Sequence, residues 1–369
     1  MKKSNFRFLI AISTLFAVTL FVQKLVPPEK ALPGSEAIFS LGFTLIGAYL
    51  FGKIVSQFRL PKITGYLFLG ILVSPYFINL LSTDIITDLR LIDNIALSLI
   101  ALTAGGEFTL ESLKRQWKLL TNIIGWQFLL IIGGVTGICL LLKPIIPILA
   151  QQSFSVALGA GLILSALSLA TSPASAIAVI TETRAKGRFT DVILEVTVAK
   201  DIIVVLAFAI VLALAEPLIL PEADLHFDYL LQVMGEILLS LVVGAVVGYL
   251  IYLYIGYVKQ QIFLFLAGMV LLIVELSLVI HIEIILVFMV AGFVVENFSS
   301  RGGALIQAVE SNSLPIYVIF FGIAGASLNF QLFLDHWLFT LILVSARLLT
   351  THLGTWIGAT LTSASSEIR

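Results

Sequence analysis

The chain has 369 residues, of which 59% are hydrophobic and 12% charged, and its mean hydropathy is +1.10. Soluble domains carry about 25% charged residues, so this composition excludes an ordinary soluble domain. The 21 basic and 22 acidic residues nearly cancel and form no basic tail or stripe, which excludes a nucleic-acid-binding protein. Apolar stretches of about 18 to 26 residues recur along the chain, each long enough to cross a bilayer as a helix. The sequence therefore predicts an all-α polytopic membrane protein.

The predicted helices follow one another with short loops and leave no room for a separate soluble domain. They cover 7–26, 36–57, 63–81, 90–112, 119–142, 154–183, 190–215, 229–257, 261–280, 283–298, 314–334 and 337–362. The first has the charge and length of a signal sequence but no convincing cleavage site, so we interpret it as a first spanning helix. Cys139, the one cysteine, lies inside an apolar stretch, so neither a disulfide framework nor a cysteine-based metal site is expected.

The basic residues of the loops predict the orientation of the chain. With a cytoplasmic N-terminus, most of them fall in inner loops, and four remain outside: Lys24, Lys30, Arg90 and Lys143. This asymmetry is the positive-inside pattern of membrane proteins. We therefore expect a multi-pass protein of the cell (inner) membrane with a cytoplasmic N-terminus.

Two pairs of segments indicate an internal repeat. ALTAGGEFTLESLKRQW (101–117) aligns with FGIAGASLNFQLFLDHW (321–337) at an offset of 220 residues. ITGYLFLGILVSP (63–75) aligns with ILVFMVAGFVVEN (285–297) at an offset of 222. The helix count makes the two copies run in opposite directions, an inverted repeat like those of many secondary transporters.

The repeat predicts the organisation of the chain. We expect an extra N-terminal helix and loop at 1–35, a first repeat at 36–215, a linking helix at 216–260 and a second repeat at 261–369. Adding the offset of 220 to Thr171 and Asp201 places the partners of these residues near 391 and 421, beyond Arg369. The second repeat is therefore expected to be truncated, with the surface near Asp201 and Arg347 left open.

The sixth predicted helix carries a polar interruption at its middle. In LSLATSPASAIAVI (167–180), Thr171, Ser172, Pro173 and Ser175 interrupt an apolar run. Proline removes a backbone donor and frees a carbonyl at mid-membrane depth. One interpretation is a kink satisfied by the hydroxyl groups. The other is a discontinuous helix, non-helical over 171–175 and in contact with the next helix, whose carbonyls and hydroxyls bind a cation.

Three charged residues lie at similar depth. Lys200 and Asp201 stand side by side in VTVAKDIIVVLAF (196–208), and Arg347 lies near the middle of the last predicted helix. A charge at the centre of a bilayer costs about 2.5 to 3.5 kcal/mol on insertion scales. The three charged residues are therefore expected to form either a buried ion-pair network or part of an ion path. Glu195 is a candidate partner of Arg347 or part of an ion entrance, and Glu107 a residue that caps or bends its helix.

These motifs together resemble one family. KIVSQFRLPKITGYLFLGILVSP, the GGEF segment, LATSPASAIAVI and VTVAKDIIVVL follow one another in this order. From about residue 36 to 362 the chain resembles the monovalent cation:proton antiporters of the sodium/hydrogen exchanger superfamily, most closely the bacterial Kef-type and Na+/H+ branch.

The resemblance implies an activity and a set of site residues. It implies a homodimer, not an enzyme and without a cofactor, whose core domain slides against a scaffold to exchange Na+, Li+ or K+ for protons. Asp201 matches the carboxylate that binds ion and proton, Thr171 and Ser172 match the ligands of the broken helix, and Arg347 matches the cation of the core domain. Lys200 departs from the Asp, Asn or Gln usual before that aspartate.

Lys200 leaves other interpretations open. The chain is alternatively a transport-inactive sensor or subunit descended from such a carrier. An intramembrane hydrolase is a third class, but the pattern offers no second catalytic carboxylate and no histidine near the depth of Asp201. Within the antiporter hypothesis, Lys200 acts as a built-in cation that occupies Asp201 when neither ion nor proton is bound. Arg347, repelled by it, is then expected to pair with Glu195.

Overall fold

The computed structural model describes residues 35–171, 173–220, 227–299 and 301–365, together with residues 14 and 368. Every regular element in these ranges is a helix, as predicted. The elements are α2 (Ser35–Ser56), α3 (Lys62–Val73), α4 (Thr83–Asp88), α5 (Arg90–Gly106), α6 (Leu110–Leu141), α7 (Pro147–Ala150), α8 (Phe154–Leu169), α9 (Pro173–Thr183), α10 (Arg188–Ile219), α11 (Phe227–Tyr257), α12 (Ile262–Ile280), α13 (Ile284–Phe298), α14 (Gly302–Glu310), α15 (Leu314–Ala326), α16 (Phe330–Asp335) and α17 (Trp337–Leu361).

Six predicted helices agree with the structure to within four residues at each end. The helix predicted at 90–112 ends earlier, at Gly106, and the one predicted at 119–142 begins earlier, at Leu110. Apart from residue 14, the helix predicted at 7–26 lies outside the described residues.

The prediction of one helix over 63–81 is wrong, because α3 ends at Val73. Ser74, extended at ψ 164°, precedes Pro75, and a residue before proline is disfavoured in the helical conformation. The chain then turns and starts α4, where the Ser82 hydroxyl accepts a hydrogen bond from the backbone N–H of Ile85.

The end of the chain adds elements that the sequence did not predict. Helix α14 falls in a stretch assigned to a loop, and the helix predicted at 314–334 is divided into α15 and α16. Helices α14 and α15 meet at 62° across a short break.

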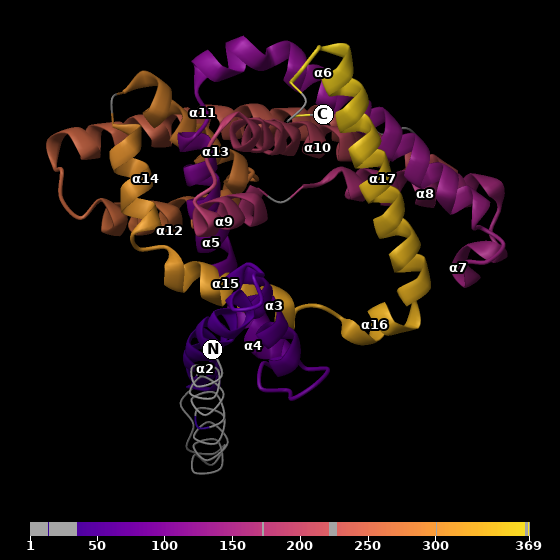
Figure 1. Ribbon diagram of the computed structural model, residues 1–369, viewed down its shortest axis with the longest axis horizontal. Coiled ribbons are helices and arrows are strands. Elements are labelled where there is room, and N and C mark those ends of the chain that lie inside the picture. Colours follow the sequence, from indigo (N-terminus) through magenta and orange to yellow (C-terminus); the bar gives the residue numbers. More distant parts are fainter. Residues whose placement is uncertain are drawn as a thin grey trace.

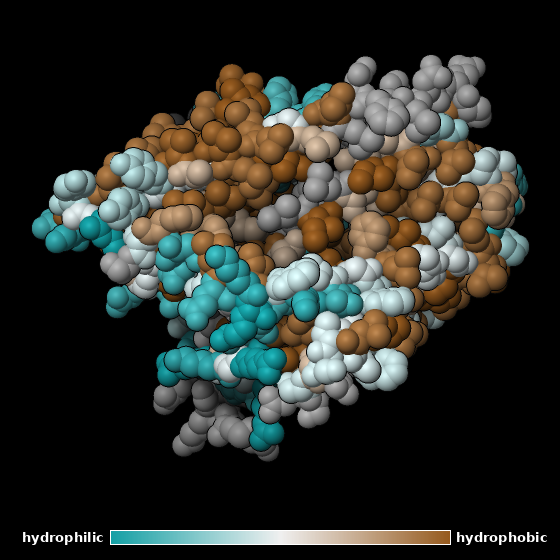
Figure 2. Space-filling model, turned by 90° about the horizontal axis from the view of Figure 1, so that it is seen from above, coloured by the Kyte–Doolittle hydropathy of each residue, from teal (hydrophilic) through white to brown (hydrophobic). Residues whose placement is uncertain are grey.

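Length and apolar composition mark several helices as membrane spans. Within the described residues, five are long and apolar enough: Ile38–Ser56, Leu113–Leu141, Leu231–Tyr257, Ile262–Ile280 and Trp337–Leu361. The bent pair α14 and α15 is a sixth candidate, and shorter apolar helices include α3, α8 and α13. In Figure 2 hydrophobic residues cover much of the visible face, while hydrophilic residues gather in its lower half. The chain is a multi-pass membrane protein.

The helices pack in two groups. The larger group contains α2 to α5 and α12 to α15, with α11 packed on α13, and it shares one large hydrophobic core. The smaller group contains α6, α8, α10 and α17, packed around buried residues such as Ile131 and Leu169. Figure 1 shows α6, α8 and α17 on one side and α12 and α14 on the other. Helix α9 joins them, because it packs against α10 and also against α3 and α5.

Glycines set the closest contact between α3 and α15. A Cβ atom added at Gly70 would collide with the carbonyl oxygen of Gly322, and one added at Gly325 would collide with that of Leu67. The two backbones therefore touch directly, as small residues allow in membrane helix pairs.

The same arrangement recurs between α5 and α13. Gly105 lies against the carbonyl oxygen of Met289, and Gly292 against that of Leu102. Gly292 aligns with Gly70, and Gly325 with Gly105, at the offsets of 222 and 220 residues in the sequence. Segments that align in sequence therefore make equivalent contacts. In each of the two helix pairs, one helix comes from the first repeat and the other from the second.

Asn297 of α13 holds the turn between α5 and α6. Its side-chain oxygen accepts a hydrogen bond of 2.6 Å from the backbone N–H of Leu110. Its amide group donates to the carbonyl oxygens of Phe108 and Phe293, each at 2.8 Å. The larger group therefore fixes the point where the chain enters the smaller one.

We expect Gly292→Ala to destabilise the protein, because an added methyl has no space between α13 and α5. Overpacking of this kind costs about 1 to 3 kcal/mol. The matched control is Gly42→Ala in α2, where an added Cβ meets no atom within 4 Å. Thermal melting in one detergent is the measurement, and equal melting temperatures for the two variants would contradict the proposed contact.

Candidate ion-binding site

The predicted discontinuous helix is present and its break is short. Helix α8 ends at Leu169, α9 begins at Pro173, and Ala170 and Thr171 between them are not helical. Ser172 lies outside the described residues. The prediction of a non-helical segment is right at Thr171 and wrong from Pro173 to Ser175. Proline has a fixed φ suited to the first turn of a helix and needs no N–H partner there, so Pro173 starts a helix.

Arg347 of α17 binds this break. Its Nη2 donates a hydrogen bond to the carbonyl oxygen of Ala170, just beyond the end of α8. A guanidinium group there satisfies a carbonyl that the helix leaves without a donor, and it complements the negative end of the α8 dipole. The side chain is half-buried. The sequence had identified Arg347 as important but had not identified this acceptor.

Glu195 has a different partner from the one predicted. Its Oε2 accepts a hydrogen bond of 3.0 Å from Nε2 of Gln116 in α6, and both residues are buried. The expected pairing with Arg347 is therefore wrong, since Arg347 reaches the break instead. Gln116 was missed because it stands in the basic segment KRQW, which looks like a loop flank in sequence.

Thr171 places a hydroxyl group at the break. Its Oγ1 is buried and, among the groups the structure describes, has no hydrogen-bond partner. Most buried hydroxyls are hydrogen-bonded, although those of Ser98, Thr136 and Ser365 also lack a partner among the described residues. Ser165 and Ser168 of α8, in contrast, donate to the carbonyls of Leu162 and Leu164.

Helix α10, which carries the charged pair, packs against both α8 and α9. Lys200 is only 3% exposed and is engaged in an interaction within the protein. Asp201 lies in the same helix, and its side chain is outside what the structure describes. The break and the charged segment of α10 thus belong to neighbouring helices, as predicted.

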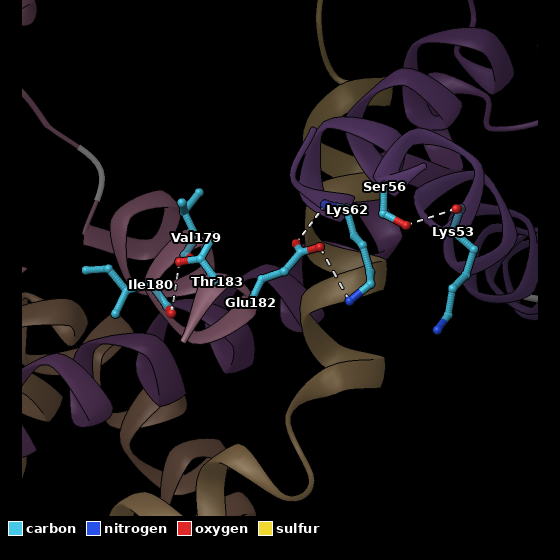
Figure 3. Close-up of polar contacts among 7 residues, drawn as sticks. All are labelled: Lys53, Ser56, Lys62, Val179, Ile180, Glu182 and Thr183. Atoms are coloured by element: carbon cyan, nitrogen blue, oxygen red, sulfur yellow. Dashed lines mark hydrogen bonds and ion pairs between the residues drawn. The ribbon is translucent and has the colours of Figure 1, made fainter. Parts of the chain in front are cut away.

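Glu182 links α9, the second segment of the broken helix, to the larger group. It lies in the last turn of α9, and its Oε2 accepts a hydrogen bond of 2.7 Å from the backbone N–H of Lys62, the first residue of α3. The Lys62 Nζ lies 3.4 Å from its Oε1 (Figure 3). The carboxylate therefore caps α3, whose N-cap Pro61 offers no side-chain oxygen. The sequence analysis did not single out Glu182.

Glu107 lies apart from the break. It follows α5 as its C-cap, in the turn held by Asn297, where Glu310 and Asp191 are its charged neighbours. Partial desolvation and then these two carboxylates raise the pKa of Glu107 from 4.5 to about 6.

One protein family matches the chain along most of its length. The profile of the family described as sodium/hydrogen exchanger, transmembrane, matches residues 42–368. Probable Na(+)/H(+) antiporter 3 of Methanocaldococcus jannaschii is 25% identical over 181 residues, which are 48% of this chain and 43% of that protein. The alignment thus spans less than half of that relative.

Solved structures match the fold. The structure of the sodium proton antiporter MjNhaP1 from Methanocaldococcus jannaschii at pH 8 superposes with a TM-score of 0.65 at 20% identity, covering 90% of this chain and 80% of that one. A second structure, a 3D EM map of MjNhaP1, gives a TM-score of 0.66 at 18% identity, with coverage of 89% and 79%.

We expect Arg347→Met to lower the melting temperature, because it removes a charged donor from the Ala170 carbonyl and leaves that oxygen without its partner. A hydrogen bond to a charged group contributes about 1.5 to 3 kcal/mol. Arg347→Lys is the matched control, since it keeps a cationic donor and is expected to retain most of the stability. Equal losses in the two variants would argue against a role for the charge.

We expect the stability of the protein to depend on pH through Glu107. Its pKa in the folded protein, about 6, is above the ordinary 4.5, so the contribution of this carboxyl to stability is present below pH 4.5 and lost as the pH rises through about 6. Glu107→Gln lacks this titration. Melting temperatures measured across this range should therefore fall more in the parent protein than in the variant. Parallel pH profiles would contradict the assignment.

Proposed function

The chain belongs to the sodium/hydrogen exchanger family, and on this basis we propose that it is a secondary antiporter that exchanges a monovalent cation, Na+, Li+ or K+, for protons. The named relatives, described as sodium proton antiporters, support this class of activity. The proposal extends to a homodimer, which the family resemblance implies, in the cell (inner) membrane, with the cytoplasmic N-terminus that the positions of the basic residues indicate.

The observation that carries this proposal is the buried hydroxyl at the break in the α8–α9 helix. Thr171 Oγ1 lacks a hydrogen-bond partner among the described residues, in a segment where backbone groups are released from the helix. Hydroxyl and carbonyl oxygens are the ligands that hard monovalent cations use, and transporter sites are built at such helix breaks. Thr171 and Ser172 are therefore the proposed neutral ligands of the ion.

Asp201 is the proposed carboxylate that binds either the cation or the proton. Desolvation in the membrane favours its protonated form, whereas a nearby cation favours its ionised form. The two occupants thus compete for one group, which is the requirement for exchange. With one titrating carboxylate, the exchange is one ion for one proton and is electroneutral.

Lys200 is proposed to compete with the transported ion and the proton for Asp201. Adjacent residues on a helix point about 100° apart, so its ammonium reaches Asp201 only through the bending of its long side chain. It is buried at 3% exposure, where an ammonium without a negative partner is costly. We therefore propose that the Lys200 ammonium pairs with Asp201 when neither an ion nor a proton is bound, and that it is displaced when either one binds.

Arg347 has a supporting role in this proposal. By binding the Ala170 carbonyl it holds one edge of the break, next to the Thr171 hydroxyl. It also neutralises the negative end of α8 without occupying the aspartate.

We expect Asp201→Asn to abolish exchange and Lys200→Asn to retain it with a shifted pH optimum. The first change removes the carboxylate of the proposed site, and the second removes only its competitor. The assay is cation-dependent proton flux in everted membrane vesicles, with Na+, Li+ and K+ supplied separately and each variant matched for protein amount. A dead Lys200→Asn protein beside an active Asp201→Asn protein would reverse the assigned roles.

The same assay distinguishes an antiporter from a transport-inactive sensor or subunit. The observation that favours the inactive alternative is Lys200, which stands where the family usually has Asp, Asn or Gln. A parent protein that moves none of the three cations, at any pH where it remains folded, would support a sensor or subunit instead of a carrier.

A further inference from the structure

A cavity lies at the end of the smaller helix group, outside the proposed ion site. It has a volume of about 600 Å³. Its walls come from the start of α6, the first turn of α10 and the residues that follow α17: Arg115, Gln116, Lys118, Leu119, Arg188, Asp191, Thr362, Ser363 and Ala364. This volume lies within the range of about 300 to 1,000 Å³ typical of ligand sites.

The described part of the cavity wall has a net positive charge. Among the described residues that line it, three are basic, Arg115, Lys118 and Arg188, and one is acidic, Asp191. All four residues are exposed. In the described part of the chain, no carboxylate lies within 4.0 Å of any of the three cationic groups. The Lys118 Nζ lies 5.9 Å from the centre of the Trp117 ring.

The start of α10 adds neutral donors. This helix begins at Arg188 after Gly187, and no side chain caps its first turn. The first N–H groups of a helix have no acceptor within the helix and carry a partial positive charge. Because Arg188 and Asp191 line the cavity, this turn forms part of its wall.

We propose that this cavity binds a phosphate group, carried either by an anionic phospholipid headgroup or by a soluble phosphate. Arginine suits this ligand because its planar guanidinium donates two parallel hydrogen bonds to phosphate oxygens. Basic cavities between membrane helices at the cytoplasmic side are suited to anionic headgroups.

Two simpler explanations account for less of the arrangement. The positive-inside pattern explains why basic residues gather at one membrane side, but not why three of them from two helices surround one cavity. A path for the transported cation is disfavoured, because the net positive wall repels it. The site is thus independent of the proposed antiport.

The test measures the melting temperature of the purified full chain in detergent during two titrations. One adds phosphatidylglycerol, with phosphatidylcholine as the neutral comparison. The other adds sodium phosphate, with sodium chloride at equal ionic strength. We expect a saturable rise with phosphatidylglycerol, with phosphate, or with both. A rise with the lipid alone identifies a headgroup site, and a rise with phosphate alone identifies a soluble anion.

Three variants locate the binding. Arg115→Gln/Arg188→Gln should weaken the apparent affinity roughly 25-fold, at about fivefold for each charge removed. Arg115→Lys/Arg188→Lys keeps the charges and should keep most of the affinity. Lys53→Gln/Lys259→Gln removes two charges elsewhere and should bind like the parent.

Two outcomes would overturn the proposal. One is no saturable rise in the parent protein with either anion. The other is an equal loss in the cavity variant and the Lys53→Gln/Lys259→Gln control, which would mean that general surface charge attracts the anion. If the double glutamine variant does not fold, Lys118→Gln alone, with an expected loss of about fivefold, decides in the same way.

Discussion

The carbonyl oxygen of Ala170 imposes a constraint on which the rest of the site depends. In a bilayer every backbone polar group needs a partner inside the protein, so a broken helix persists only where other groups replace its lost hydrogen bonds. Arg347 supplies one replacement from α17, and Pro173 reduces the need by starting α9 without an N–H. The break is therefore specified by two helices together, and α17 must pack on α6 for Arg347 to reach it.

That packing rests on small residues. Gly354 and Gly358 of α17 lie against the backbone of α6 at Gln127 and Ile123, where an added Cβ would meet main-chain atoms. In the larger group, the paired glycine contacts of α3 with α15 and of α5 with α13 serve the same purpose. Without a hydrophobic driving force between membrane helices, close van der Waals contact is a main source of their association. Two groups of closely packed helices result, joined by α9 and by the packing of α10 on α11.

The polar groups between helices have separate tasks. Glu182 fastens α9 to α3, and Gln116 holds Glu195 between α6 and α10. Neither contact involves the break itself, where the Thr171 hydroxyl belongs to the proposed ion site. The carboxylates near Glu107 and the basic cavity around Arg115 lie outside this region. The proposed transport site and the proposed phosphate site are thus built from different residues, while Gln116 both holds Glu195 and lines the cavity.

The sequence alone determined the membrane class, most helices, the interruption before Pro173 and the repeat, because apolar length, proline and glycine act locally or recur at a fixed offset. It also identified Lys200, Asp201 and Arg347, since a charge in an apolar run is conspicuous. Only the tertiary structure decided the partners. Arg347 binds Ala170 across 177 residues, Glu182 caps Lys62 across 120, and Gln116 reaches Glu195 across 79. Such pairings depend on how the helices rotate and pack, which the periodicity of the side chains does not determine. The prediction that Arg347 pairs with Glu195 rested on membrane depth alone and was therefore wrong.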